Sequence, residues 1–185
     1  MGTRRVVTGH AADGSSVIAS DEVVEPTKLS LLPGWEFVRL WGADAPPRFP
    51  DDGSMPPHDQ YFPPVGGFRF GLFTIPPDSV ADLGDVDFES GFAEMEAALP
   101  GMAAHMEPDS PGMHTTATVD YEFVVSGSVV LELDDGVEVT LRPGDTVIQN
   151  GTRHALAQPW FRTLHGGGGA RRCTQLESER VPKAE

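Results

Sequence analysis

The chain has 185 residues and a formal net charge of −15, from 28 acidic and 13 basic side chains. This length suits one domain that buries roughly 70% of the surface exposed by its unfolded chain, and the acidic balance argues against nucleic acid or an anionic membrane as a partner. Its one cysteine, Cys173, excludes an intramolecular disulfide, and the lack of a signal-peptide core or of an apolar run of about 18 residues predicts a cytoplasmic protein.

The N-terminal part of the chain predicts strands. Residues 4–24 read as two strands around Asp13-Gly14, a dipeptide that accepts the positive φ angles of a tight hairpin turn. Residues 29–42 should form a strand that is broken at Pro33-Gly34, and residues 68–75 are rich in β-forming side chains. We therefore expect a hairpin followed by two further strands.

Between these strands, residues 43–67 hold too many prolines for a helix or a central strand. We expect this segment to be an irregular loop on the surface, packed against the outside of the sheets. The alternative is that the loop brings His58, Asp59 and Tyr61 to the mouth of a pocket.

One helix is predicted over residues 87–99. Its start can be capped by Asp87 or Ser90, and Pro100-Gly101 ends it. Apolar side chains recur at helical spacing along one face, which we expect to pack onto a sheet rather than to form a cofactor site. That stripe consists of Phe88, Phe92, Met95 and Leu99.

Five short runs of β-forming residues follow from residue 121 onward, and each run is ended by residues that favour turns. The turn segments are Ser126-Gly127, Asp134-Asp135-Gly136, Pro143-Gly144-Asp145, Asn150-Gly151-Thr152 and Gln158-Pro159. Repeated short strands at this spacing predict an antiparallel sandwich or barrel, because such a sheet closes or packs to remove its edges.

The pattern weakens after Pro159. Residues 166–185 are first glycine-rich and then highly charged, which predicts a flexible C-terminal tail. A closed barrel would need one more strand in this region. Domain swapping with a second copy of the chain, an N-terminal strand that fills the gap, or an altered C-terminus would each account for its absence.

Two short motifs between Gly112 and Gln158 resemble the paired histidine motifs of the cupin superfamily. In the first, His114 is followed by Asp120, where the family has a glutamate, and then by Gly127 after six residues. Thr116 stands at the position of the family's second histidine. The first motif therefore keeps the family's spacing but has one imidazole fewer.

The second motif runs from Pro143-Gly144-Asp145 through Gly151 to His154. Gln149 replaces a proline of the family pattern, and Gln158 replaces an asparagine. The resemblance implies an all-β, cupin-like double-stranded β-helix (jelly-roll) barrel with an N-terminal strand extension and one short helix. Its parts would be N-terminal strands and loop packed on the barrel (1–80), the barrel core (81–165) and the tail (166–185).

The resemblance also implies a site inside the barrel. In metal-binding cupins the histidines and the glutamate hold iron, manganese, zinc or nickel, so the implied metal ligands here are His114, Asp120 and His154, with Gln149 as a further neutral oxygen ligand. Two histidines and one carboxylate suffice for a site with open positions. A barrel that binds its ligand without metal is the alternative.

Without metal, the same three residues are the candidate catalytic groups. An Asp–His pair inside a barrel has shifted pKa values and can perform general acid–base catalysis. Glu122 lies two residues after Asp120 and should share its face of a regular strand, which makes it a substitute carboxylate. Tyr121 and Arg153 should lie on the other face or at the rim.

Two functions follow as hypotheses. The first is a small-molecule-binding cupin that acts as a lyase, isomerase or oxygenase on a small oxygenated metabolite with a carbonyl, enol or carboxylate group. The second is a non-catalytic ligand-binding or scaffold cupin without metal. The resemblance further implies a homodimer that forms through the N-terminal strands before Gly42.

Overall fold

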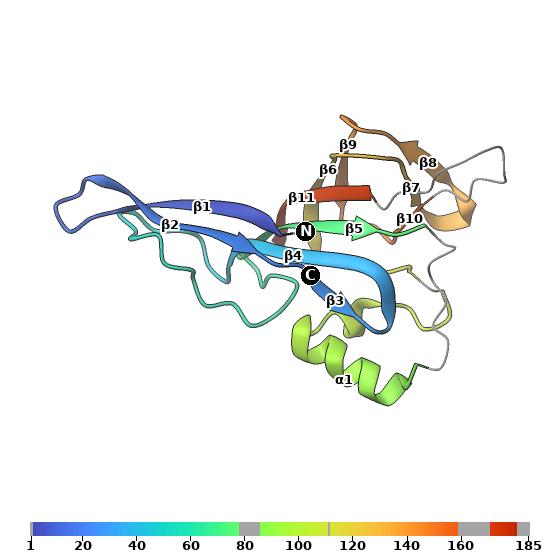
Figure 1. The fold of residues 1–185 in the computed structure, drawn as a ribbon. Helices are drawn as coiled ribbons and strands as arrows, with labels where there is room; N and C mark the ends of the chain where they lie inside the picture. The colour runs from blue at the N-terminus through green and yellow to red at the C-terminus, as the bar shows by residue number, and fades with distance from the viewer. Residues whose placement is uncertain (1, 78–85, 111, 159–170, 181–185) are drawn as a thin grey trace.

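The computed structural model describes residues 2–77, 86–110, 112–158 and 171–180, the last of these by its backbone (Figure 1). Two single-turn helices, Ala103–His105 and Asp134–Gly136, accompany the main elements. The main elements in chain order are β1 Thr3–His10, β2 Ser16–Val24, β3 Thr27–Leu29, β4 Leu32–Ala43, β5 Phe68–Ile75, α1 Phe88–Ala98, β6 Thr118–Val124, β7 Val129–Glu132, β8 Glu138–Leu141, β9 Thr146–Asn150, β10 Ala155–Ala157 and β11 Arg171–Arg180.

The described strands form three antiparallel sheets. The largest has the order β3-β4-β5-β11-β6-β9, a second has the order β10-β7-β8, and β1 pairs with β2. A hydrophobic cluster lies between the first two sheets and joins them. Its buried members are Ile75 and Val124 from the six-stranded sheet and Val129, Leu131 and Leu141 from the three-stranded sheet. The predicted all-β, jelly-roll type fold with one short helix is confirmed.

Strand β11 contradicts the prediction that the C-terminal residues form a flexible tail. Residues 171–180 form a ten-residue strand that pairs with β5 on one side and with β6 on the other. The missing strand of the large sheet therefore comes from this chain's own C-terminal region. Residues 166–170 and 181–185, also assigned to the tail, lie outside the described residues.

The N-terminal hairpin has the predicted form. Strands β1 and β2 extend away from the other two sheets, and part of the loop between β4 and β5 runs beside them (Figure 1). The backbone N–H of His10 donates to the carbonyl of Asp51 at 2.8 Å, which ties the loop to the hairpin. Gly14 has a φ of 82° in the turn, as its position required. The predicted break at Pro33-Gly34 is wrong, because β4 begins at Leu32 and continues through both residues.

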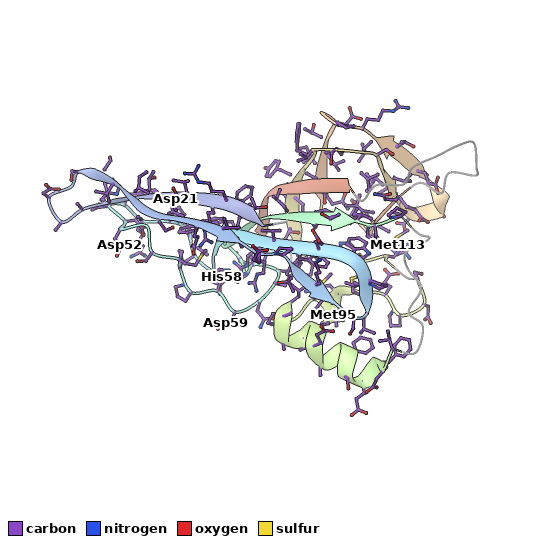
Figure 2. All side chains as sticks on the ribbon, in the orientation of Figure 1. Asp21, Asp52, His58, Asp59, Met95 and Met113 are labelled. Atoms are coloured by element: carbon purple, nitrogen blue, oxygen red, sulfur yellow. The ribbon has the colours of Figure 1, made fainter. Side chains whose placement is uncertain are left out.

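The predicted helix is confirmed as α1. The Asp87 side chain caps it by accepting a hydrogen bond from the N–H of Glu89 at 3.1 Å, and Gly101, with a φ of 79°, follows its end. Met95 and Leu99 are buried against β3 and β4, and Figure 2 shows Met95 on the side of α1 that faces these strands. The other half of the predicted apolar stripe does not pack in this way, since Phe88 and Phe92 are 57% and 53% exposed. No helix within the described ranges is both long and apolar enough to span a membrane.

Candidate functional site

A cavity of about 450 Å³ lies between α1, the strands of the large sheet and the segment that leads into β6. Most of its wall is apolar. The aromatic and methionine side chains of this wall are Trp35, Phe37, Tyr61, Phe62, Phe73, Phe88, Phe92, Met95, Met102 and Met106. Polar groups also line the cavity, and they include all three site residues expected from the sequence, namely His114, Asp120 and His154.

The backbone brings the two histidines together although 39 residues separate them in the sequence. The N–H of each donates to the carbonyl of the other, and both N···O distances are 3.0 Å. Their imidazole rings lie with centroids 4.2 Å apart at an interplanar angle of 49°. This short antiparallel bridge, directly before β10, fixes both rings side by side on the cavity wall.

The hydrogen bonds of the two rings define their tautomer. Nδ1 of His114 lies 3.1 Å from the carbonyl oxygen of Gly112, and Nδ1 of His154 lies 3.0 Å from that of Thr152. A carbonyl can only accept, so each Nδ1 carries the proton and each neutral ring keeps the lone pair on Nε2. Burial, and then the neighbouring His114, lower the pKa of His154 to about 4, and burial also lowers the pKa of His114. Both rings are therefore predominantly neutral at pH 7.

Two carboxyl groups come from β6. Asp120 and Glu122 are 4% and 6% exposed and point inward, while Tyr121 between them is 39% exposed on the opposite face. This alternation is the predicted consequence of strand geometry. Burial, and then the charge of Asp120, raise the pKa of Glu122 to about 8. At pH 7 the Glu122 side chain is therefore mainly a protonated carboxylic acid, a proton donor on the wall of the cavity that both histidines line.

Gln149 and Thr116 do not line the cavity, although both belong to the motif positions. The Gln149 amide donates to the carbonyl of Thr152 at 2.8 Å, and this same carbonyl accepts from His154. Gln149 thus fixes the position of the Thr152 carbonyl, the group that accepts the Nδ1 proton of His154. The hydroxyl of Thr116 lies 2.7 Å from that of Thr118 in a buried pair.

The three residues expected to hold a metal share the cavity wall but do not form a close cluster. Within the described ranges, no group of three or more His, Cys, Asp or Glu side chains is arranged so that it could hold a metal ion. The donor set implied by the resemblance therefore does not fit a three-residue metal centre in this conformation.

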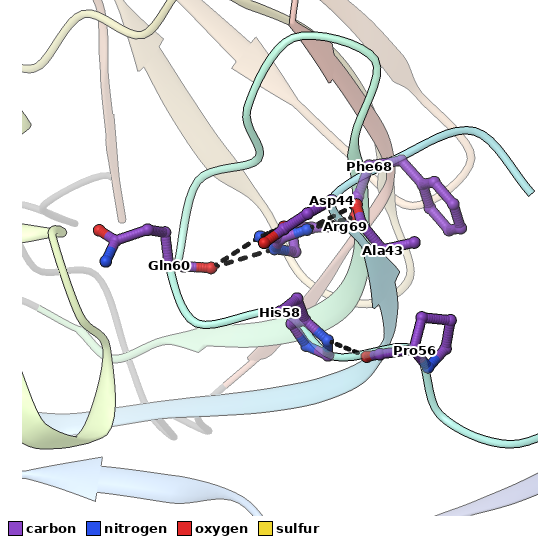
Figure 3. A network of polar contacts seen from close by, with 7 residues as sticks. All are labelled: Ala43, Asp44, Pro56, His58, Gln60, Phe68 and Arg69. Carbon is purple, nitrogen blue, oxygen red and sulfur yellow. Dashed lines mark hydrogen bonds and ion pairs between the residues drawn. The ribbon is translucent and has the colours of Figure 1, made fainter.

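The proline-rich loop contributes one of its three candidate residues. Tyr61 lies on the cavity wall, edge-on to Phe37 with ring centroids 6.3 Å apart, whereas His58 and Asp59 do not line the cavity. The Arg69 guanidinium fixes this part of the loop by donating to the Gln60 carbonyl at 2.9 and 3.1 Å (Figure 3). Burial raises the pKa of the Tyr61 hydroxyl to about 12, so it remains protonated at pH 7.

Sequence reasoning did not place α1 at the site. Phe88 and Phe92 line the cavity with half of their surface exposed. Their spacing in the apolar stripe was visible in the sequence, but helical spacing alone does not distinguish a core face from the wall of a pocket.

The protonation of Glu122 predicts a specific dependence of stability on pH. Its pKa is about 8 in the folded protein against an ordinary value of 4.5, so the folded state binds more protons between these values. The unfolding free energy should therefore fall as pH rises. From pH 7.5 to 8.5 the two histidines are almost entirely neutral in both states, because the pKa of an unfolded histidine is about 6.5, and the Glu122 contribution should fall by up to about 1.4 kcal/mol per pH unit.

Urea unfolding at several pH values tests this expectation. The variant Glu122→Gln should lose the downward slope between pH 7.5 and 8.5, whereas Glu138→Gln, which alters an exposed carboxylate on β8, should keep it. Identical slopes for wild type and Glu122→Gln would show that Glu122 is ionised in the folded protein.

Together these features describe an all-β protein with a jelly-roll type fold and a partly open cavity that is lined by two histidines and two buried carboxyl groups. No protein-family model matches the chain. It is 33% identical over 115 residues to the phomopsin biosynthesis cluster protein C' of Diaporthe leptostromiformis, across 58% of this chain and 59% of that protein. It is also 37% identical over 49 residues to the oryzines biosynthesis cluster protein J of Aspergillus oryzae, across 26% and 27%.

Each of these matches covers less than two thirds of the relative's own length. Among solved structures, ethanolamine utilization protein Q from Salmonella typhimurium LT2 aligns over 97% of both chains, with a TM-score of 0.40 and 11% sequence identity. At that degree of likeness the fold assignment rests on the strand order and sheet packing described above.

Proposed function

We propose that the protein is an enzyme that moves protons on a small carbonyl compound bound in the cavity, as an isomerase or lyase does. One observation supports this most strongly. His114 and His154, whose Nδ1 atoms donate to backbone carbonyls and whose Nε2 atoms can accept a proton, line the same cavity as the protonated carboxyl group of Glu122. Enolisation of a ketone requires a proton acceptor and a proton donor in the same site.

The proton transfers balance within these groups. Nε2 of one imidazole removes a proton from the carbon next to the carbonyl, and the carboxylic acid of Glu122 gives its proton to the carbonyl oxygen, which yields a neutral enol. The imidazolium then exchanges its proton with solvent; when it delivers a solvent proton to the same carbon and the enol hydroxyl returns its proton to Glu122, the carbon has exchanged its hydrogen. Delivery of the proton to another carbon isomerises the substrate. The names of the two relatives, both from biosynthesis clusters, are in keeping with a metabolic role.

Deuterium exchange tests the proposal without knowledge of the natural substrate. The protein would be incubated at pH 7 in D₂O with 2-tetralone, 1-indanone and acetophenone, and loss of the proton signals next to each carbonyl would be followed by NMR. General acid–base catalysis should accelerate exchange of at least one ketone by about 100-fold or more over buffer. Exchange at the buffer rate for all three would contradict the proposal.

A second candidate function is non-catalytic binding of a small ligand. It is favoured by Thr116, which pairs with Thr118 at 2.7 Å and leaves the first motif without a second imidazole. A ligand that raises the melting temperature and is recovered unchanged after long incubation would support it. Conversion of any bound compound would exclude it.

A metal-dependent version of the enzyme has a separate test. Metal content would be measured by elemental analysis on wild type and on His114→Ala, both purified without chelator. Because a neutral imidazole with its Nδ1 proton tied to a carbonyl is also a suitable metal ligand, metal that is present in wild type and lost in the variant would support this version. Equal and negligible metal in both proteins would exclude it.

We also propose that the protein is a cytoplasmic homodimer that forms through the N-terminal hairpin. The outward face of the hairpin carries Val6, Ile18 and Val23, which are 48%, 62% and 58% exposed. Isolated two-stranded hairpins are marginally stable, and apolar residues on their open face favour a partner. Size-exclusion chromatography with light scattering should give a dimer mass for wild type and a monomer mass for Val23→Asp.

Val137→Asp provides the matched control for this prediction, because Val137 is also half-exposed, at 53%, but lies away from the hairpin. It should remain dimeric. A monomeric wild type would contradict the proposed dimer.

A further inference from the structure

A second cavity, of about 40 Å³, shares part of its wall with the large cavity. The shared residues are Phe37, Tyr61, Phe62 and Phe73. The second cavity is also lined by two arginines, Arg39 and Arg69, and by no aspartate or glutamate among the described residues. The chain as a whole has a formal net charge of −15, so this positive wall runs against the overall charge of the protein.

Arg69 has no hydrogen-bond donor left for a ligand. Its guanidinium donates to the carbonyls of Ala43 and Phe68, each at 2.9 Å (Figure 3). It also donates twice to the Gln60 carbonyl, at 2.9 and 3.1 Å, and once to the Asp44 carboxylate. These contacts use all five N–H groups of the guanidinium, and Asp44 balances its charge.

Arg39 differs from Arg69 in this respect. Its Nη2 atom is buried and has no hydrogen-bond partner, and no ion pair within the described part of the chain includes Arg39. An arginine remains charged at pH 7. A guanidinium nitrogen that has lost water without gaining an acceptor is unfavourable, so an anion beside Arg39 would be stabilised.

The register of β4 and β5 leaves space beside Arg39. The residue directly opposite on β5 is Gly71, which also lines the cavity. Side chains at such opposite positions normally contact each other, but glycine has none. A Cβ atom at Gly71 would lie only 2.7 Å from the carbonyl oxygen of Val38. The close approach of the two strands therefore requires glycine here, and the glycine keeps the space next to the guanidinium open.

The size and wall of the cavity suit a small planar anion. A single water molecule needs about 10–15 Å³ of such space, so a cavity of about 40 Å³ has room for a carboxylate group. A planar guanidinium matches the two oxygens of a carboxylate. The Tyr61 hydroxyl, which is protonated at pH 7, belongs to the same wall and offers a further donor.

We infer that the second cavity is a carboxylate-binding site in which Arg39 donates to the anion. The site is separate from the proposed catalysis, because His114, His154 and Glu122 do not line this cavity. Two sources can supply the carboxylate. One is a small free acid, and the other is the acid end of a longer ligand whose apolar part lies in the adjoining large cavity.

Thermal unfolding in two sodium salts tests the inference. The melting temperature of the wild type would be measured at pH 7 in sodium acetate and in sodium chloride, at equal concentration and therefore equal ionic strength. Because a ligand that binds only the folded state raises the melting temperature, the value in about 100 mM acetate should exceed that in chloride by about 2 °C or more. Equal melting temperatures in the two salts would overturn the inference.

Arg39→Met links this response to Arg39. The variant removes the charge and keeps a long apolar side chain, so its melting temperatures in the two salts should be equal. Arg48→Met is the matched control, because Arg48 is exposed on the loop between β4 and β5 and does not line the cavity. It should keep the wild-type difference. A wild-type difference in Arg39→Met would overturn the inference.

Arg39→Lys provides a second test if Arg39→Met does not fold. Lysine keeps the positive charge but lacks the planar pair of N–H groups that matches a carboxylate. The difference between acetate and chloride should therefore be smaller in this variant than in the wild type. An unchanged difference would overturn the inference.

A second acid identifies the source of the carboxylate. 4-Phenylbutanoate carries the same group on an apolar chain that ends in a ring, and its affinity would be compared with that of acetate by isothermal titration calorimetry. Binding that is about tenfold tighter, and that falls in Phe92→Ala, would identify a ligand that extends into the large cavity, since Phe92 lines only that cavity. Similar affinities would identify a small free acid. Wild-type affinity of Arg39→Met for both acids would overturn the inference.

Discussion

His154→Asn is expected to slow the catalysed deuterium exchange of a bound ketone by about 100- to 10,000-fold, the usual range for loss of a general base. The asparagine amide nitrogen occupies the position of Nδ1 and keeps the hydrogen bond to the Thr152 carbonyl, which is 3.0 Å long in the wild type. The substitution therefore removes Nε2 while it leaves the local backbone contact in place. Exchange rates would be measured by NMR at pH 7.

The control for this prediction is His105→Asn. His105 also has its Nδ1 near a backbone carbonyl, that of Thr115 at 3.2 Å, but it does not line the cavity. Its variant should retain the wild-type exchange rate. If His154→Asn also retained that rate, His154 would not be the base, and the same test applied to His114→Asn would decide whether His114 takes that role.

Leu99→Ala is expected to lower the unfolding free energy by about 2–5 kcal/mol, as is typical of a buried leucine truncated to alanine. Leu99 is 0% exposed at the end of α1 and packs in a cluster with Leu29, Phe37 and Met95. The loss would combine the transfer free energy of the removed atoms with the cost of the cavity that they leave. Urea unfolding monitored by circular dichroism gives the value.

Phe88→Ala is the matched change on the same helix. Its side chain is 57% exposed, so its removal should cost less than about 1 kcal/mol. Similar losses for both variants would mean that α1 packs on the sheets along its whole apolar stripe, and that Phe88 does not belong to an open cavity wall.

The sequence predicted those parts of the fold that depend on neighbouring residues. The hairpin turn at Asp13-Gly14, the helix after Asp87 and the short strands after residue 121 all follow from local turn and capping preferences. The inward position of Asp120 and Glu122 followed from strand alternation alone. Each of these features depends only on residues that are close together in the sequence.

Other features depended on contacts between distant parts of the chain. Residues 171–180 are highly charged, and their role as a strand between β5 and β6 comes from backbone pairing that composition does not reveal. The roles of Tyr61 and of Phe92 depend on how a loop and a helix close over the same cavity. Gln149 was expected as a metal ligand, but its amide holds the carbonyl that orients His154.

The proposed catalysis requires that the imidazoles of His114 and His154 are both neutral and carry their proton on Nδ1. The ¹⁵N chemical shifts of the histidine side chains, measured by NMR in a uniformly labelled sample and followed with pH, distinguish these states. We expect His114 and His154 both to be neutral Nδ1–H tautomers at pH 7, and His154 to remain neutral until the pH approaches about 4. Imidazolium signals at pH 7, or a proton on Nε2 of either ring, would contradict it.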